Sequence, residues 1–305
     1  MADQIDPTNA TSSAFNRRAF VGFSAGATAY ASTIAAALAA GEDFGKPHPP
    51  VVAENDPAIA TGRPQLKDGA RTIDSYYASP RNAGPTTPAV VVVQHIWGVD
   101  AQIRDTVRRL AKEGYIAIAP DLYTGLAAPS GDGMTDYTAF KPAASALSDA
   151  QVDADLASAA RFVRSGAGGQ MQKIGVIGFC MGGAITLRQA IDNAATFQAA
   201  AIFYGKVRYD TSGNGVGAIT PMALAYADEI AVPLAGSWGA RDTGILAADV
   251  AALDARMTAL KKTHDIKVYD EAGHAFFDDT RNAYVAGPAA DAWTRTLAWF
   301  ATHLK

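Results

Sequence analysis

Residues 173–183 read KIGVIGFCMGG, an apolar run that leads directly into a cysteine between glycines. The run is typical of a strand covered on both faces of a sheet, and residues 182–191 behind it have helical spacing. A strand that turns sharply into a helix, with a nucleophile at the turn, is a nucleophile elbow, and Cys180 stands where serine is usual. The helix N-terminus that follows favours a thiolate. An inert core cysteine beside packing glycines is the alternative interpretation.

Apolar runs and segments of helical spacing alternate on both sides of this stretch. Strands are predicted at residues 89–94, 115–119, 173–178, 199–204, 232–238 and 266–269, and helices at 100–112, 149–164, 182–191, 245–262 and 289–303. This alternation predicts an α/β fold, with a mostly parallel central sheet and helices on both faces. No internal repeat or linker divides the pattern, so we expect one domain over 71–305, preceded by an extended lead-in at 41–70.

Composition and cysteine content exclude several classes of function. The chain has 305 residues, of which 49% are hydrophobic, and a formal net charge of −4 without a basic stripe, so we expect no nucleic-acid partner. Cys180 is the only cysteine, which excludes an intramolecular disulfide and weakens a redox or binding role for the thiol. No histidine pair stands at ligand spacing, so no metal or other cofactor is predicted.

The N-terminal segment, residues 1–40, has the pattern of an export signal. Arg17 and Arg18 precede an uncharged stretch rich in small residues, and Ala37-Leu38-Ala39 offers a cleavage site. The segment resembles a twin-arginine signal peptide, which predicts a periplasmic or exported protein. A membrane anchor formed by an uncleaved signal is the alternative, although so alanine-rich a stretch inserts weakly. We expect no stable membrane insertion once it is removed.

A thiol nucleophile needs a base and a carboxylate that orients it. A sheet of this kind places its site at the carboxyl ends of the strands, where His95 and His274 are expected. The remaining histidines are His48, His264 and His303. In the chain order of this fold, nucleophile, acid and then base, His274 is the predicted base and Asp242 the predicted acid. The alternatives are a turn aspartate and a surface histidine.

The elbow, Asp242 and Gly273–Phe276, in this order, resemble the dienelactone hydrolase family of α/β-hydrolases. Further matching segments are Ile103-Arg104-Asp105, Gly114-Tyr115, Ala119–Tyr123 and Tyr204-Gly205. The resemblance covers about residues 70–305. It implies a Cys180-Asp242-His274 triad that hydrolyses an ester or lactone through a thioester. It also implies an oxyanion hole formed by the backbone N–H groups of Ile96 and Met181.

The chain departs from the family pattern at His95, where a glutamate that pairs with the cysteine is usual. A histidine can accept the thiol proton or, when charged, stabilise a thiolate. A paired histidine that merely lines the pocket is the alternative. The loops at 124–148 and 205–231 leave the carboxyl ends of strands, so they are expected to overhang the site. Tyr204 and Tyr123 are candidate substrate-binding or thiol-activating residues.

A second departure concerns the charge of the substrate. Family members that act on anionic lactones hold the substrate carboxylate with two arginines. The matching segments here are Thr124-Gly125-Leu126 and Asp278-Asp279, which carry no arginine. We therefore expect a neutral or apolar ester or lactone, with Arg104, Arg208 and Arg281 as the cations that would favour an anionic one. An acyl transferase or a peptidase on the same fold is the alternative function, and no oligomeric state is predicted.

Overall fold

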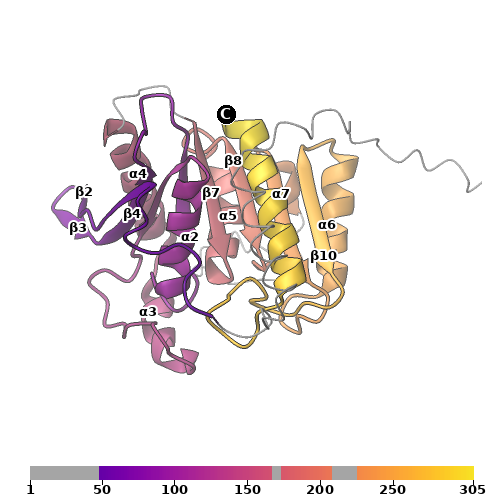
Figure 1. The fold of residues 1–305 in the computed structure, drawn as a ribbon. Helices are drawn as coiled ribbons and strands as arrows, with labels where there is room; N and C mark the ends of the chain where they lie inside the picture. Colours follow the sequence, from indigo (N-terminus) through magenta and orange to yellow (C-terminus); the bar gives the residue numbers. More distant parts are fainter. Residues whose placement is uncertain (1–47, 167–172, 208–224) are drawn as a thin grey trace, which may run out of the picture.

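The computed structural model describes residues 48–166, 173–207 and 225–305, and Figure 1 shows a central sheet with helices in front of it and behind it. The sheet has eight strands in the order β1-β4-β6-β5-β7-β8-β9-β10. Neighbours from β6 to β10 pair in parallel, whereas β4 is antiparallel to both β6 and β1. The predicted α/β class, with a mostly parallel sheet, is confirmed.

The bounds of the elements follow. The strands are β1 (Ile59–Gly62), β2 (Leu66–Asp68), β3 (Arg71–Ile73), β4 (Ser75–Pro80), β5 (Ala89–Val93), β6 (Ile116–Pro120), β7 (Ile174–Phe179), β8 (Ala199–Phe203), β9 (Leu234–Gly239) and β10 (His264–Tyr269). The helices are α2 (Ala101–Lys112), α3 (Lys141–Ala146), α4 (Asp149–Gly166), α5 (Met181–Asp192), α6 (Ala247–Ala259) and α7 (Ala286–Leu304), with 3-10 turns η2 (Tyr137–Phe140) and η3 (Ala225–Asp228).

Buried side chains form one apolar cluster on each face of the sheet. Along β5, Val90 and Val92 point into one cluster, and Val91 and Val93 point into the other, as the twofold repeat of a strand requires. Helices α2 and α7 cover the first cluster, and helices α4, α5 and α6 cover the second. A strand buried on both faces is continuously apolar, which is why the valine run was recognisable in the sequence.

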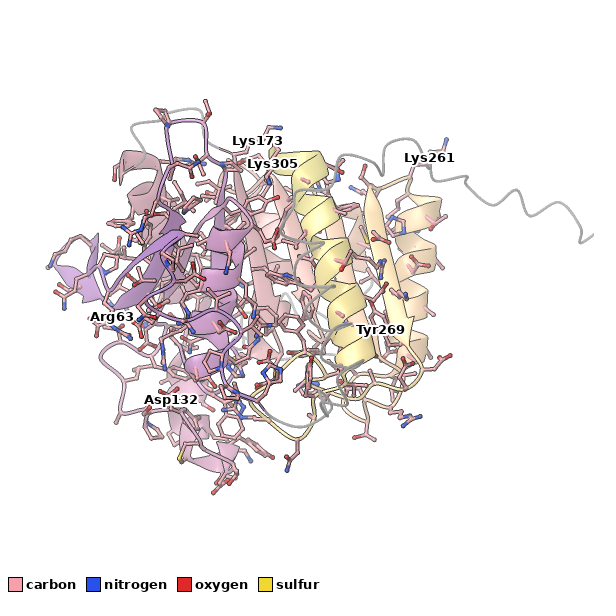
Figure 2. All side chains as sticks on the ribbon, viewed as in Figure 1. Arg63, Asp132, Lys173, Lys261, Tyr269 and Lys305 are labelled. Carbon is pink, nitrogen blue, oxygen red and sulfur yellow. The ribbon has the colours of Figure 1, made fainter. Side chains whose placement is uncertain are left out.

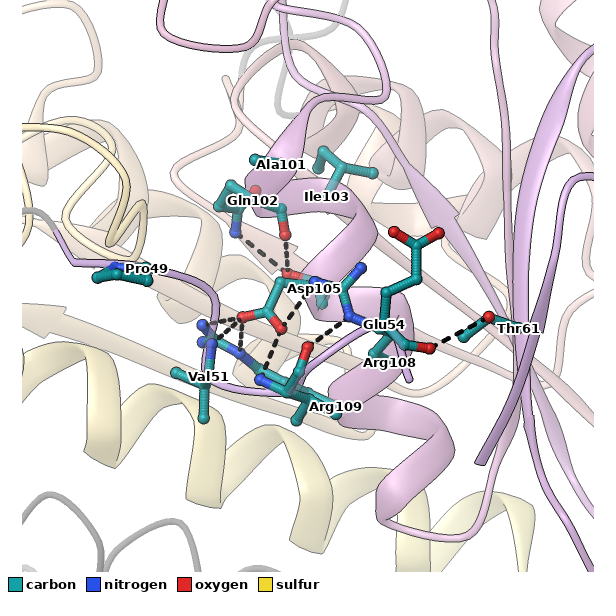
Figure 3. Close-up of polar contacts among 12 residues, drawn as sticks. Pro49, Val51, Glu54, Thr61, Ala101, Gln102, Ile103, Asp105, Arg108 and Arg109 are labelled. Carbon is teal, nitrogen blue, oxygen red and sulfur yellow. Dashed lines mark hydrogen bonds and ion pairs between the residues drawn. The ribbon is translucent and has the colours of Figure 1, made fainter. Parts of the chain in front are cut away.

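The N-terminal boundary of the domain differs from the prediction, because part of the expected lead-in at 41–70 belongs to the sheet. Strand β1 pairs with β4 at the sheet edge, with Ile59 opposite Pro80. Residues before β1 also bind helix α2: the backbone N–H groups of Val51 and Val52 each donate to the Asp105 carboxylate at 2.9 Å (Figure 3). These short edge strands lack a clear apolar pattern, so the sequence did not reveal them.

Two further segments refine the sequence interpretation. The predicted loop at 124–148 contains η2 and α3, and β10 begins at His264 rather than at Ile266. The proposed signal at residues 1–40, Arg208 and most of the loop at 205–231 lie outside the described residues. Across the described ranges, every helix is too short or too polar to cross a membrane.

Candidate active site

The site lies at the carboxyl ends of the parallel strands. In Figure 2, Lys173, which precedes β7, lies at the upper edge of the molecule, and Tyr269, the last residue of β10, lies toward the lower edge. The strands therefore end at the lower edge, where the turns after β5, β7, β8 and β9 meet. This is the edge at which a wound sheet of this kind places its site.

The turn between β7 and α5 is a strained elbow with Cys180 at its apex. Cys180 has φ 54° and ψ −114°, a conformation that a residue with a side chain rarely adopts. A side chain at Gly178 would place its Cβ 2.0 Å from the Gly182 carbonyl oxygen, and one at Gly182 would lie 2.4 Å from the Val93 oxygen. Only glycine fits at these positions, so the sequence pattern reflects the packing of the turn. Strain of this kind is concentrated at functional sites.

The structure brings the three predicted side chains into contact. Nε2 of His274 lies 3.0 Å from the Cys180 Sγ, and Nδ1 of His274 lies 2.7 Å from the Asp242 Oδ2. The other carboxylate oxygen of Asp242 accepts backbone N–H groups from Gly244 at 2.8 Å and Ile245 at 3.1 Å. Asp242 is buried and held at both oxygens, so it fixes the tautomer and the orientation of the imidazole.

The charges of this group favour a proton on His274. Burial alone would raise the pKa of the Cys180 thiol, but the hydrogen bond and charge of His274, together with the charge of His95, lower it below its ordinary value. Burial opposes protonation of His274, but hydrogen bonds to Asp242 and Cys180 raise its pKa to about 10. For Asp242, the hydrogen bond with His274 outweighs burial and lowers the pKa. Both shifts favour the ion pair of a thiolate and an imidazolium over the neutral pair of a thiol and an imidazole.

A cavity of about 450 Å³ opens beside the thiol, within the size range of small-molecule sites. Its lining combines these three side chains with mostly apolar neighbours. The lining residues are Ile96, Cys180, Met181, Ala184, Tyr204, Lys206, Asp242, Thr243, Gly244, Ile245 and His274. Lys206 was not singled out in the sequence; its position after Tyr204-Gly205, at the end of β8, was the available signal.

Both predicted oxyanion residues line the cavity. The Met181 N–H hydrogen-bonds to the Cys180 sulfur and helps to lower its pKa. Ile96 follows β5, which pairs in register with β7. Tyr123 lies outside the cavity lining: its hydroxyl donates to the Ile96 carbonyl at 2.9 Å, so it supports the loop rather than facing the opening. Tyr204 lines the cavity, with its ring 5.3 Å from the His274 ring.

His95 follows β5, the parallel neighbour of β7, and lies in a buried ionic cluster. Its Nε2 is 2.8 Å from the Asp100 Oδ1, and its Nδ1 is 3.9 Å from the Asp278 Oδ2. Arg281 joins the same two carboxylates, at 2.9 Å to Asp100 and 2.6 Å to Asp278. The sequence had not indicated Asp100 as a partner of His95, because an N-cap aspartate is unremarkable at the start of a helix.

The cluster bears on the expected charge of the substrate. Asp278 is buried against Arg281 and is not a lining residue of the cavity, so it does not face an incoming carboxylate. Arg281 is occupied by two carboxylates, and Arg104 is paired with Asp132 at 2.7 Å. Lys206 is the lysine or arginine side chain among the described lining residues, and it is exposed.

The described residues contain no group of three or more histidine, cysteine, aspartate or glutamate side chains that could hold a metal ion.

Comparison with known proteins identifies the family. The sequence profile of the dienelactone hydrolase family matches residues 73–304. A Salmonella typhimurium protein named as a carboxymethylenebutenolidase is 36% identical over 255 residues, which is 84% of this chain and 92% of that one. A Methylorubrum extorquens protein of the same name is 38% identical over 239 residues, 77% of this chain and 78% of that one.

A solved structure named as a dienelactone hydrolase from Klebsiella pneumoniae matches in three dimensions as well. Its TM-score is 0.71 at 38% sequence identity, and the match covers 81% of this chain and 100% of that one. The predicted resemblance is confirmed over nearly the whole sheet and its helices. The chain belongs to the dienelactone hydrolase family and is a hydrolase with the α/β-hydrolase fold.

Proposed function

We propose that the protein hydrolyses a carboxylic ester or lactone, with Cys180 as the nucleophile, His274 as the acid and base, and Asp242 as the orienting carboxylate. The observation that carries the proposal is the continuous contact from the Cys180 Sγ through His274 to Asp242 on the wall of a cavity. Its supports are the family membership and the curated relatives, whose name refers to a butenolide, which is a lactone.

The first half of the reaction forms a thioester. The Cys180 thiolate attacks the substrate carbonyl carbon, and the carbonyl oxygen becomes an oxyanion that accepts the Ile96 and Met181 N–H groups. One such donor accounts for about 3 kcal/mol of the barrier in comparable enzymes. When the intermediate collapses, the carbon–oxygen bond breaks, and the His274 imidazolium gives its proton to the leaving alkoxide.

The second half regenerates the thiolate. Neutral His274 takes a proton from water, and the hydroxide attacks the thioester carbonyl at the same oxyanion site. The carbon–sulfur bond then breaks, the acid product leaves, and sulfur and imidazolium return as a pair. Asp242 stabilises the imidazolium in both halves without taking the proton itself.

We propose a neutral or apolar substrate. Outside Cys180, His274 and Asp242 the lining is mostly apolar, and Arg104 and Arg281 are already paired with aspartates. Lys206 is exposed, and a single exposed ion pair contributes at most about 1 kcal/mol. A carboxylated substrate therefore gains little over its neutral analogue.

The test is a panel of nitrophenyl esters and small lactones, assayed with the native protein, Cys180→Ala and Cys180→Ser. We expect hydrolysis by the native protein, a burst of alcohol, and a mass increase on Cys180 equal to the acyl group. Neutral esters should be turned over at least as fast as carboxylated ones. An active Cys180→Ala variant, or the absence of an acyl adduct under single-turnover conditions, would contradict the proposed nucleophile.

The same assay separates hydrolysis from the alternative functions on this fold. An added alcohol or amine that captures most of the acyl group would indicate an acyl transferase, and cleavage of amides faster than esters would indicate a peptidase. A thiol that is alkylated readily but acylated by none of the substrates would leave the redox or binding alternative.

We further propose that the hydrolase is exported. The support is the Arg17-Arg18 pair before an uncharged, small-residue stretch. Replacing both arginines with lysine keeps the charge but removes the guanidinium pair. If export requires the two arginines, the variant should remain in the cytoplasm. Cell fractionation with an antibody to the domain measures this, and equal export of both forms would contradict the proposal.

A further inference from the structure

His95 lies next to the elbow but outside the chain of contacts that links Cys180, His274 and Asp242. It follows β5, which pairs in parallel with β7 so that Val93 lies opposite Gly178, just before the cysteine. The His95 side chain is only 6% exposed. A buried histidine at this position needs partners of its own, and those partners define its charge.

Both ring nitrogens of His95 face carboxylates. Nε2 is within hydrogen-bond distance of Asp100, at 2.8 Å, and Nδ1 is within ion-pair distance of Asp278, at 3.9 Å. A neutral imidazole carries one N–H donor and one lone pair, so one of the two carboxylates would face a lone pair. A doubly protonated ring donates an N–H to Asp100 and places its positive charge within ion-pair distance of Asp278. The geometry therefore fits the imidazolium, in which neither nitrogen has a lone pair to take a proton from sulfur.

The charge of the surrounding cluster leads to the same state. Asp100 and Asp278 are both buried, and Arg281 is the guanidinium that bridges them. Two carboxylates and one guanidinium leave one buried negative charge, which is costly when uncompensated. A protonated His95 brings the sum to zero. Asp100 also caps helix α2 through the Ile103 N–H, so its carboxylate cannot turn away.

We propose that His95 is a permanently charged imidazolium, held between Asp100 and Asp278 at the end of the strand next to the elbow, that stabilises the Cys180 thiolate and does not act as a base. The proposal rests on the proposed role of Cys180 as nucleophile, and it makes His95 a positioning residue. It decides between the two routes that the sequence left open. Burial and the charge of Arg281 lower the pKa of His95. Asp100 and Asp278 outweigh both and raise that pKa above its ordinary value.

The groups that face His95 come from three elements. Asp100 lies at the start of α2, and Asp278 and Arg281 lie in the segment before α7. Cys180 lies in the elbow, where the charge of His95 favours the thiolate. Asp100 and Asp278 are each paired with both His95 and Arg281, so we expect the charge of His95 to stay constant while the enzyme works.

The test measures the reactivity of the thiol itself, with iodoacetamide as the probe, over a range of pH. In His95→Asn we expect alkylation of Cys180, below the pKa of the thiol, to be about tenfold slower than in the native protein, because loss of the positive charge raises the thiol pKa and leaves less thiolate. His264→Asn is the matched control: its Nε2 also pairs with an aspartate, Asp254, at 3.1 Å, but at the opposite end of β10. That variant should match the native profile.

An unchanged alkylation profile in His95→Asn would overturn the proposal. Alkylation does not require an ester, so the two proposals can fail separately. If the native protein hydrolyses none of the substrates but His95→Asn still shifts the pH profile of Cys180 alkylation, the proposed function is contradicted and this inference is supported. The reverse outcome, normal hydrolysis with an unshifted thiol, would do the opposite.

A second measurement keeps the proposal testable if His95→Asn does not fold. Nitrogen-15 spectra of the native protein, with histidine labelled and His95 assigned through backbone connectivity, report the protonation of both ring nitrogens. We expect imidazolium shifts at both nitrogens from about pH 6 to about pH 8, across the range in which a free histidine titrates. A neutral tautomer of His95 at neutral pH would overturn the proposal.

Discussion

Two histidine–aspartate pairs lie near the elbow, and they differ in what the second ring nitrogen faces. His274 binds Asp242 at 2.7 Å and His95 binds Asp100 at 2.8 Å, so the first contact is nearly the same. The remaining nitrogen of His274 faces the Cys180 sulfur, whereas that of His95 faces Asp278. The His274 side chain is 42% exposed and that of His95 is 6% exposed.

The difference shows that a histidine–aspartate pair does not by itself define a proton carrier. A ring that faces a thiol on one side and a carboxylate on the other can hand its proton over, because the thiol can titrate. A ring between two carboxylates that are already paired with Arg281, as His95 is, should keep its proton, because the proton neutralises the excess negative charge of the cluster. The His274 ring is exposed, so substrate and water can reach it. The His95 ring is buried, so they cannot reach it.

The largest expected effect comes from removing the proton carrier. We expect His274→Ala to lower kcat/KM for a nitrophenyl ester by about 10⁴-fold or more, as in hydrolases in which nucleophile and base act as a unit. His95→Asn should lower it by only about tenfold, since the charge it supplies is one of several acting on the thiolate. Steady-state kinetics on both variants measures the contrast. Comparable losses would mean that His95 shares the proton transfer.

Replacing Asp242 should lower kcat more than replacing Asp100, in parallel with the two histidines but with smaller losses. Asp242→Asn leaves the imidazole without the acceptor that fixes its tautomer, and kcat should fall by about 10³- to 10⁴-fold. Asp100→Asn, which leaves that acceptor intact, should lower kcat by no more than about tenfold. An Asp242→Asn variant with nearly native kcat would show that Asp242 serves only the turn at Gly244.

The order of effects reverses when stability is measured. Asp100 is buried, binds both His95 and Arg281, and caps helix α2, so Asp100→Asn leaves buried charge unpaired. The free energy of unfolding should fall by about 3 kcal/mol. For Asp242→Asn we expect a loss of about 1 kcal/mol, because the amide oxygen can still accept the Gly244 and Ile245 N–H groups. Urea unfolding followed by circular dichroism provides both values, and equal losses would contradict the charge balance of the cluster.

The sequence predicted one member of this comparison much better than the other. The elbow is recognisable because glycine alone fits at Gly178 and Gly182, and the order of nucleophile, acid and base follows from strands that end at one edge. The His95 cluster depends on a side chain from the start of α2 and two from the segment after His274. Asp100 and Arg281 are 181 residues apart in the sequence, so no local sequence pattern indicates that they are in contact. The edge strand β1 was missed because it is short and lacks a clear apolar pattern. Its pairing with β4 can be seen only once β4 itself has been placed.

The pH dependence of kcat/KM should follow the pair formed by Cys180 and His274. The thiol pKa is lowered from its ordinary value of 9.0. Activity should therefore rise tenfold per pH unit below the lowered pKa, as the thiolate forms, and level off above it. His274 has its pKa raised to about 10, so activity should fall only above about pH 10, when no imidazolium remains to protonate the leaving alkoxide. In His95→Asn the rising limb should move to higher pH and the falling limb should stay. Movement of the falling limb alone would contradict the assignment of the two limbs.

The smallest expected effect concerns Lys206, the exposed cation of the cavity lining. An exposed ammonium gives a carboxylate at most about 1 kcal/mol, or about fivefold in kcat/KM. Lys206→Ala should therefore change the ratio of kcat/KM values for a carboxylated ester and its neutral analogue by no more than about fivefold. High salt should produce a similar change in the native protein, because it screens exposed charges. A change of about a hundredfold would mean that Lys206 binds the substrate as a desolvated partner, and the substrate would then be an anion rather than the neutral ester proposed here.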